Sequence, residues 1–165
     1  MYKQLALTLA CLAGTAAAAR AQATADAPVT VAVQANLGLT ETGTTDFGTL
    51  NNNAGSGTVD PIAPAAGTTT AMFTASGTPN ANIRATWTSV SLRLSDNSAS
   101  VSFTPKVSSS AANTQSGSTV TTSGSTVALN ATGNAYFWLG GDVALAANQK
   151  PGTYSGTFTL TVVYN

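Results

Sequence analysis

The chain has 165 residues, of which 43% are hydrophobic and only 7% are charged, whereas about 25% charged residues is usual in globular proteins. Histidine is absent and Cys11 is the only cysteine, which argues against His-assisted catalytic triads, Cys/His metal sites and internal disulfides. The formal net charge is zero, and no cluster of basic residues is available to bind nucleic acid or anionic lipid. We therefore expect no nucleic-acid partner and no cofactor.

Residues 1–23 have the features of a cleaved secretory signal peptide. Lys3 precedes an Ala- and Leu-rich apolar stretch, and an Ala-x-Ala pattern follows at Ala21 and Ala23. The apolar stretch is shorter than the roughly 20 residues that cross a bilayer, so we expect no transmembrane segment. We predict cleavage after Ala23, with Ala21 as the alternative, and a mature domain of residues 24–165.

The start of this domain, residues 25–39, alternates between apolar and polar side chains. Period-two alternation is typical of a β-strand with one buried face. Two interpretations are open, because the pattern is the same in both: the segment is the domain's own first strand, or it is a donor strand that pairs with another copy. The apolar positions are Val29, Val31, Val33, Ala35, Leu37 and Leu39.

Short apolar stretches continue along the chain, separated by segments rich in Gly, Asn, Asp and Pro. They are residues 46–50, 59–62, 69–75, 82–94, 101–103, 135–139 and 143–145. Within residues 82–94 the apolar side chains change from odd to even positions, which predicts a bulge or break near Thr88 and Ser89. Residues 108–126 contain almost only Ser, Thr, Gly, Ala and Asn, and predict a long surface loop or exposed hairpin with little contribution to the core.

The C-terminal segment shows the clearest alternation in the chain. Apolar side chains recur at every second position from Phe158 to Tyr164, between threonines at 157, 159 and 161, so we expect this apolar face in the core. In total, seven or eight short strands without helices predict an all-β fold, an immunoglobulin-like β-sandwich.

Two segments resemble a family of bacterial secreted domains that has no assigned function. They are residues 46–50, Asp-Phe-Gly-Thr-Leu, and residues 150–164, in which a Gly-x-Tyr-x-Gly turn leads into a Thr/Val strand. This family is similar to the adhesin and pilin superfamily, near the archaic chaperone-usher pilins and the spore coat protein U group. The residues of the C-terminal pilin-like motif are Gly152, Tyr154, Gly156, Phe158, Leu160, Val162 and Tyr164. The mature chain departs from many pilins of this superfamily in having no cysteine pair.

The resemblance implies a pilin-like structural subunit of a fimbria or pilus-like surface polymer, serving cell adhesion or biofilm cohesion. Such subunits assemble by donor-strand complementation, in which the N-terminal segment of one subunit fills a groove in the next, and residues 25–39 would be that polymerisation strand. The resemblance also implies self-association, a periplasmic chaperone and an outer-membrane usher as partners, and a location at the cell surface or outside the cell, reached through the periplasm.

Two other functions fit the composition. One is a secreted β-sandwich of a surface coat or matrix that does not polymerise. The other is a carbohydrate-binding module, since aromatic rings stack on sugars; the aromatic residues considered are Phe47, Trp87, Phe103, Trp138 and Phe158. Phe103 and Phe158 suit the core better, whereas Trp138 is out of phase with its neighbours and is the one candidate for an exposed aromatic.

We do not expect an enzyme. The acidic residues are Asp26, Glu41, Asp46, Asp60, Asp96 and Asp142. None lies within three residues of another, so they suit turns better than a glycosidase pair or a calcium loop. The many Ser and Thr hydroxyls have no histidine to activate them. We accordingly predict no catalytic, cofactor-binding or metal-binding residues.

Overall fold

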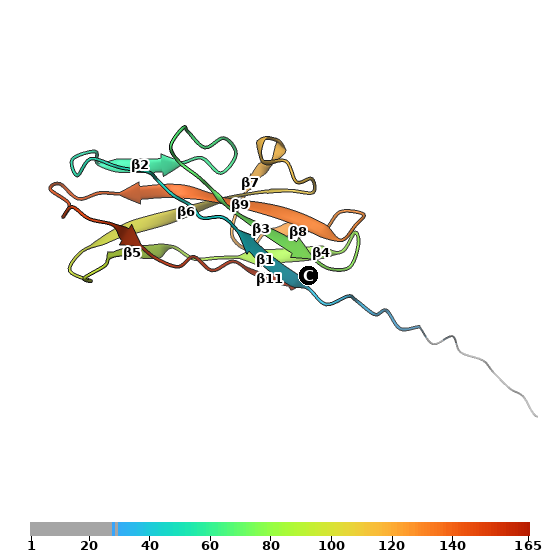
Figure 1. Cartoon of the computed structure of the whole chain (residues 1–165). Helices are drawn as coiled ribbons and strands as arrows, with labels where there is room; N and C mark the ends of the chain where they lie inside the picture. Colours follow the sequence, from blue (N-terminus) through green and yellow to red (C-terminus); the bar gives the residue numbers. More distant parts are fainter. Residues whose placement is uncertain (1–27, 29) are drawn as a thin grey trace, which may run out of the picture. The chain divides into compact units, whose positions relative to one another are not determined.

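The structure, a computed structural model, describes residue 28 and residues 30–165. The chain from Val33 to Asn165 forms one compact unit of antiparallel β-strands (Figure 1). The strands are β1 (Gly38–Thr42), β2 (Ser56–Val59), β3 (Ala71–Ser76), β4 (Asn82–Thr86), β5 (Val90–Leu94), β6 (Ser100–Ser110), β7 (Thr119–Thr121), β8 (Thr126–Ala128), β9 (Asn134–Ala144), β10 (Tyr154–Ser155) and β11 (Thr161–Tyr164). Within the described residues, the one helical element is a 3-10 turn, η1 (Gln115–Gly117). The predicted signal peptide, residues 1–23, lies outside the described residues.

The strands form two antiparallel sheets that share one hydrophobic core. The order of the larger sheet is β1-β3-β9-β6-β5-β10, with β2 also paired to β9 and β7 also paired to β6, and the order of the smaller sheet is β11-β4-β8. Phe73 and Phe137 of the larger sheet share the buried core with Ile83 and Ala85 of the smaller one. The predicted all-β class is thus confirmed, and the two sheets are consistent with a β-sandwich.

Strand β9 lies at the centre of the larger sheet, between β3 and β6. It joins the two apolar stretches 135–139 and 143–145 into a nearly continuous strand of eleven residues. Gly141 makes this possible, because its φ is 148° and a Cβ there would collide with the Thr104 carbonyl oxygen. A glycine inside a strand pattern often marks such a close backbone approach rather than the end of the strand.

The predicted break near Thr88 and Ser89 is confirmed, because β4 and β5 are separate strands in different sheets. The C-terminal strands β10 and β11 pair with β5 and β4, respectively. Ser155 pairs with Arg93, and Thr161 pairs with Thr86. The five residues 156–160 therefore lie opposite the six residues 87–92. One extra residue shifts the alternation to the other face, as in a bulge, and this accounts for the change from odd to even apolar positions.

Two sequence predictions about the strands need correction. The described chain has eleven strands rather than seven or eight, because several contain only two or three residues and show no alternation. Residues 108–126 are also not wholly superficial: Ser108 and Ser109 extend β6 and are buried, as is Ser118. The Ser108 hydroxyl donates to the Pro61 carbonyl (3.0 Å) and accepts from the Ser118 hydroxyl (2.8 Å), so its burial leaves no polar atom without a partner.

The prediction that Trp138 is an exposed aromatic is wrong, because only 4% of this residue is exposed. In the register of the sheet, Trp138 lies between Met72 on β3 and Ser108 on β6. The Pro61 carbonyl accepts hydrogen bonds from the Ser108 hydroxyl and from the Gln115 side chain (2.9 Å). These bonds hold the segment at Pro61 and the turn η1 over the outer face of the sheet, and this cover explains the burial of Trp138.

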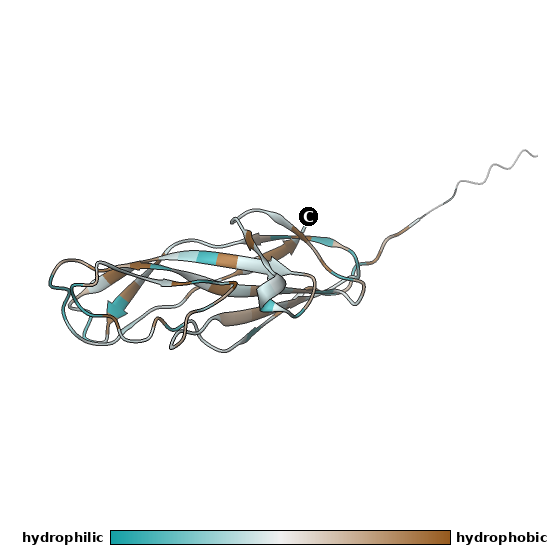
Figure 2. Cartoon of the chain, turned by 90° about the horizontal axis from the view of Figure 1, so that it is seen from above, coloured by the Kyte–Doolittle hydropathy of each residue, from teal (hydrophilic) through white to brown (hydrophobic). Residues whose placement is uncertain are grey.

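The hydropathy of the chain is moderate along most of the ribbon (Figure 2). Strongly hydrophilic segments are few, as the low content of charged residues requires. Hydroxyl and amide side chains therefore cover most of the solvent-facing sheet surface, where they are compatible with β-structure.

Candidate functional site

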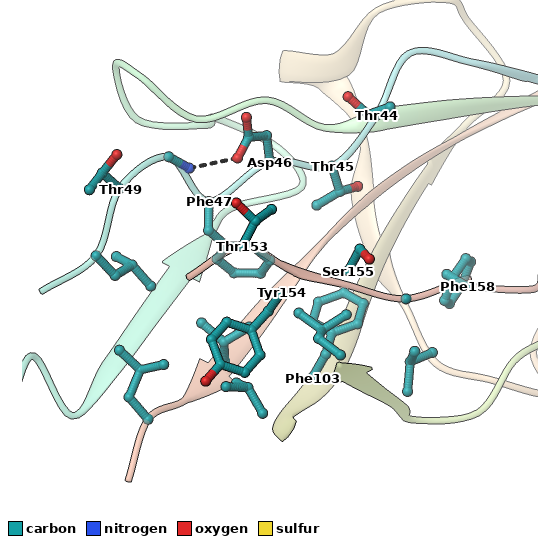
Figure 3. A pocket seen from close by; sticks show the side chains of 18 of the residues that line it. Thr44, Thr45, Asp46, Phe47, Thr49, Phe103, Thr153, Tyr154, Ser155 and Phe158 are labelled. Carbon is teal, nitrogen blue, oxygen red and sulfur yellow. Dashed lines mark hydrogen bonds between the residues drawn. The ribbon is translucent and has the colours of Figure 1, made fainter. Parts of the chain in front are cut away.

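A groove of about 1030 Å³ lies beside the hydrophobic core of the compact unit. One wall consists of residues 44–52 and the other of residues 149–158 (Figure 3). The floor is formed by core side chains of the larger sheet: Ala71, Phe73, Val90, Leu92, Val101, Phe103, Leu139 and Val143. The volume is at the upper end of the roughly 300–1,000 Å³ found for small-molecule pockets, and the floor is apolar.

The first wall contains the segment 46–50 and is held by hydrogen bonds of its backbone. Asp46 pairs with Thr69 as an isolated bridge, with N–O distances of 3.1 and 3.0 Å. The Asp46 carboxylate also accepts a hydrogen bond from the Gly48 N–H (2.9 Å) and so fixes the turn (Figure 3). Phe47 then lies edge-on against Phe103 of the floor, with ring centroids 5.7 Å apart. An edge-to-face pair of this kind adds to the burial energy of the two rings.

The second wall contains the first half of the C-terminal pilin-like motif, since Gly152, Tyr154, Gly156 and Phe158 all line the groove. Phe158 packs against Phe73 of the floor, at a centroid distance of 5.9 Å. The Tyr154 hydroxyl donates to the Lys150 carbonyl and accepts from the Gln149 side chain, both at 2.7 Å. The two segments that carry the family resemblance thus face each other across the groove (Figure 3).

Both walls adjoin sheet edges. The larger sheet ends at β1 on one side and at β10 on the other, and β11 ends the smaller sheet. Residues 156–160 lie between the β10 and β11 ladders without strand pairing of their own. Terminal strands have unpaired backbone N–H and C=O groups along their outer edge, so the groove offers an apolar floor between two edges that can accept a further strand.

The second half of the C-terminal motif lies beyond the groove. Leu160 is buried in the core, and Val162 and Tyr164 pack against it. The predicted inward orientation of Phe158, Leu160 and Val162 is therefore confirmed. The sequence did not indicate that the Tyr164 hydroxyl bonds to the backbone of Ala35, because those two residues are 129 positions apart.

The structure divides the predicted polymerisation strand 25–39 into two parts. Leu37 and Leu39 pack against the core, and β1, which contains Leu39, pairs with β3. Val31 and Val33 are each 85% exposed. Ala35 is also exposed and outside any strand, and Val29 lies outside the described residues. The first strand of the unit thus begins at Gly38 instead of continuing the alternation from residue 29.

The acidic side chains in the described part of the chain mostly support turns. Asp46, Asp60 and Asp96 each accept a hydrogen bond from the backbone N–H two residues later, as predicted for turn residues. Asp142 instead lies on β9, where it forms an ion pair with Lys106 at 2.8 Å. A hydrogen bond from Lys106 lowers the pKa of this carboxyl group, opposed by its partial burial. Asp26 lies outside the described residues.

Asp96 joins the turn after β5 to the start of the second wall. Hydrogen bonds from the Ser98 hydroxyl, the Lys150 ammonium and the Ser98 N–H hold the pKa of Asp96 well below its ordinary value. The Lys150 Nζ atom is 2.9 Å from the Asp96 carboxylate and 2.6 Å from the Ser98 hydroxyl. Because the folded-state pKa is depressed, the contribution to stability is present above the unfolded pKa of about 3.9 and is lost as the pH falls through the folded pKa.

We therefore expect Asp96→Asn to lower the stability of the protein by an amount that depends on pH. At pH 7 the variant should unfold at lower denaturant concentration than the wild type. The difference should shrink steadily below pH 4, because the carboxyl group of the unfolded wild-type chain then binds a proton while the folded protein still holds it ionised. Urea titrations of both proteins between pH 2 and pH 7 measure this. An equal difference at every pH would show that the charge of Asp96 does not contribute.

The remaining aromatic candidates also face inward. Phe103 is buried in the core, and Phe47, Trp87 and Phe158 are partly buried and pack against it. With Trp138 buried as well, none of these five residues presents a freely exposed ring to a sugar.

Fold and groove together define an all-β domain with an apolar-floored groove beside its core. Residues 37–164 match the family described as Domain of unknown function (DUF4402). The match covers about three quarters of the chain, which therefore belongs to this family. It begins at Leu37, the residue at which the described chain begins to pack against the core. No curated protein matches the chain. In the stretch that the structure describes, no helix is long and apolar enough to cross a membrane.

Proposed function

We propose that the protein is a structural subunit of a fimbria or pilus-like surface polymer, assembled by β-strand complementation between copies and serving adhesion or biofilm cohesion. The observation that carries the proposal is the groove, which lies between two sheet edges and is lined by half-buried apolar side chains such as Val90, Leu92 and Phe158. A strand inserted there would cover the half-buried apolar side chains of the groove and pair with unpaired backbone groups at the sheet edges at the same time.

The proposed occupant is the N-terminal segment of another copy, before Ala35. Its apolar positions Val29, Val31 and Val33 alternate and carry no charge. Val33 is exposed in the chain to which it belongs. Full burial of each valine would contribute about 1.5–3 kcal/mol before the cost of ordering the segment is subtracted.

The rest of the proposal follows the resemblance to secreted pilins. Residues 1–23 would be removed as a signal peptide, and the domain would have the immunoglobulin-like, pilin-like form of the sandwich. A periplasmic chaperone and an outer-membrane usher would protect and assemble the subunits, since a subunit with an apolar groove and free strand edges is prone to aggregate. The polymer would lie on the cell surface.

The second interpretation, a coat or matrix domain that does not polymerise, requires that the groove be filled within one chain. The segment before Ala35 would then have to enter its own groove. A carbohydrate-binding module has less support, because the aromatic residue proposed for it, Trp138, is buried.

We expect Val33→Asp to abolish polymer formation in the chain 24–165 without unfolding the domain, because a carboxylate cannot be buried in an apolar groove without a large cost. Gln34→Asp is the matched control, since it adds the same charge one position away, on the opposite face of an extended strand. Light scattering and negative-stain microscopy measure the polymer, and circular dichroism monitors the fold. If both variants polymerise like the wild type, the segment is not the donor.

A further inference from the structure

Tyr164 fastens the chain at the point where the N-terminal segment joins the compact unit. Its hydroxyl donates a hydrogen bond to the Ala35 carbonyl (2.8 Å) and accepts one from the Thr78 N–H (2.7 Å). The Ala35 N–H donates to the Thr78 hydroxyl (2.7 Å). Both backbone polar groups of Ala35 are thus bonded to the unit, although this residue is outside any strand. We call Ala35, Thr78 and Tyr164 the Tyr164 clamp.

The neighbouring Gly77 leaves the space that the Tyr164 clamp needs. A Cβ atom at this position would collide with the Tyr164 hydroxyl. Figure 1 shows that the C-terminus, next to β11, lies at the same end of the unit as the start of β1. The last strand therefore brings its tyrosine to the first strand and fixes the direction in which the chain enters β1.

We infer that the Tyr164 clamp prevents the N-terminal segment from filling the groove of its own chain and so directs it to the groove of a second copy. The inference rests on the proposed function, because it concerns which copy supplies the strand. To fill its own groove, the segment would have to reverse direction just before β1 and pair with the free edge of that strand.

The shortest reversal is a hairpin with a two-residue loop at Ala35 and Asn36. Val33 would then lie opposite Gly38. Directly opposed residues of an antiparallel pair point to the same face of the sheet. Gly38 and Leu39 point to opposite faces, and Leu39 packs against the core. The valines of the segment would therefore point away from the core, and this hairpin would not fill the groove.

A loop of three residues, 34–36, would restore the correct face, because Val33 would then lie opposite Leu37. Ala35 would be at the centre of that loop. Its N–H and carbonyl groups would have to leave Thr78 and Tyr164, so both hydrogen bonds of Ala35 in the Tyr164 clamp would break. The clamp thus opposes the short hairpin that places apolar side chains toward the core, while it leaves the segment free to reach another molecule.

The test uses the chain 24–165, which has no native cysteine, with cysteines introduced at Val31 and at Leu92 on the groove floor. A short flexible bis-maleimide reagent links them when the segment occupies a groove. On a denaturing gel, a link within one chain gives a monomeric loop and links between chains give a ladder. We expect mainly a ladder when Tyr164 is present. Tyr164→Phe should raise the ratio of loop to ladder by about 2- to 10-fold, the effect of one or two net hydrogen bonds.

Tyr136→Phe is the control, because it also removes a tyrosine hydroxyl, from a residue of β9 that neither lines the groove nor belongs to the Tyr164 clamp. It should leave the ratio of loop to ladder unchanged. A ladder that persists unchanged in Tyr164→Phe, or an equal change in both variants, would overturn the inference and leave the proposed function standing. A predominant loop with Tyr164 present would overturn the inference directly. Absence of any linkage would overturn the proposed function, and the inference with it.

Discussion

Replacing Leu160 by Ala is expected to lower the free energy of unfolding by about 2–5 kcal/mol. Leu160 is buried in the core at the end of the second wall of the groove, just before β11. The substitution removes apolar contacts and leaves a cavity, and neighbouring strands that are fixed by backbone pairing relax only partly. Urea denaturation of the two proteins measures the change, which is a large fraction of the total stability of an ordinary domain.

Thr159→Ala is the control for this prediction. Thr159 is the neighbouring residue and is exposed, so its replacement should change the stability by no more than about 0.5 kcal/mol. Similar destabilisation by both substitutions would mean that the C-terminal segment is sensitive to any change, rather than anchored by its inward face. If Leu160→Ala left the free energy of unfolding unchanged, the result would contradict the burial of Leu160 in the core.

Local alternation predicted the inward faces and the break between β4 and β5 because both depend on neighbouring residues. The burial of Leu160 follows from period-two spacing alone, and the shift near Thr88 follows from a change of phase. Very short strands such as β7 and β10 were not visible in this way, since two or three residues define no period.

Contacts between distant residues account for what the sequence did not reveal. Trp138 is buried under a segment held by bonds from Ser108 and Gln115 to Pro61, which span 47 and 54 residues. The alternation predicts that Trp138 points away from the core, but it does not indicate whether another segment covers that face of the sheet. The serines of the 108–126 segment were misjudged for the same reason, because a small polar side chain can be buried when long-range partners satisfy it.

The groove was anticipated only through the family resemblance. The pattern of residues does not show that segments 46–50 and 150–158 face each other, since the first follows β1 and the second contains β10, and these two strands lie at opposite edges of the larger sheet. Nor did it show where the N-terminal segment changes from packing within the chain to exposure. That boundary, between Ala35 and Leu37, is determined by Tyr164 and by the start of β1.

The position of this boundary leads to a prediction about a shortened chain and an added peptide. Deleting residues 24–33 retains Ala35, β1 and the whole family match. The shortened protein should therefore fold as a monomer with an open groove. If residues 25–39 were instead one continuous strand of their own domain, the same deletion should remove most of it and unfold the protein.

A synthetic peptide of residues 25–35, which carries Val29, Val31 and Val33, should bind this shortened monomer and stabilise it by mass action. At a peptide concentration 100 times its Kd, the stabilisation is about 2.7 kcal/mol, which corresponds to a rise in Tm of roughly 5–12 °C for a domain of this size. The same peptide with Val31→Asp is the control and should leave Tm unchanged, because the charge lies at the centre of the buried face. Scanning calorimetry with increasing peptide measures both. A folded monomer whose Tm does not respond to the unmodified peptide would show that the groove does not accept this strand, and strand complementation by the N-terminal segment would have to be abandoned.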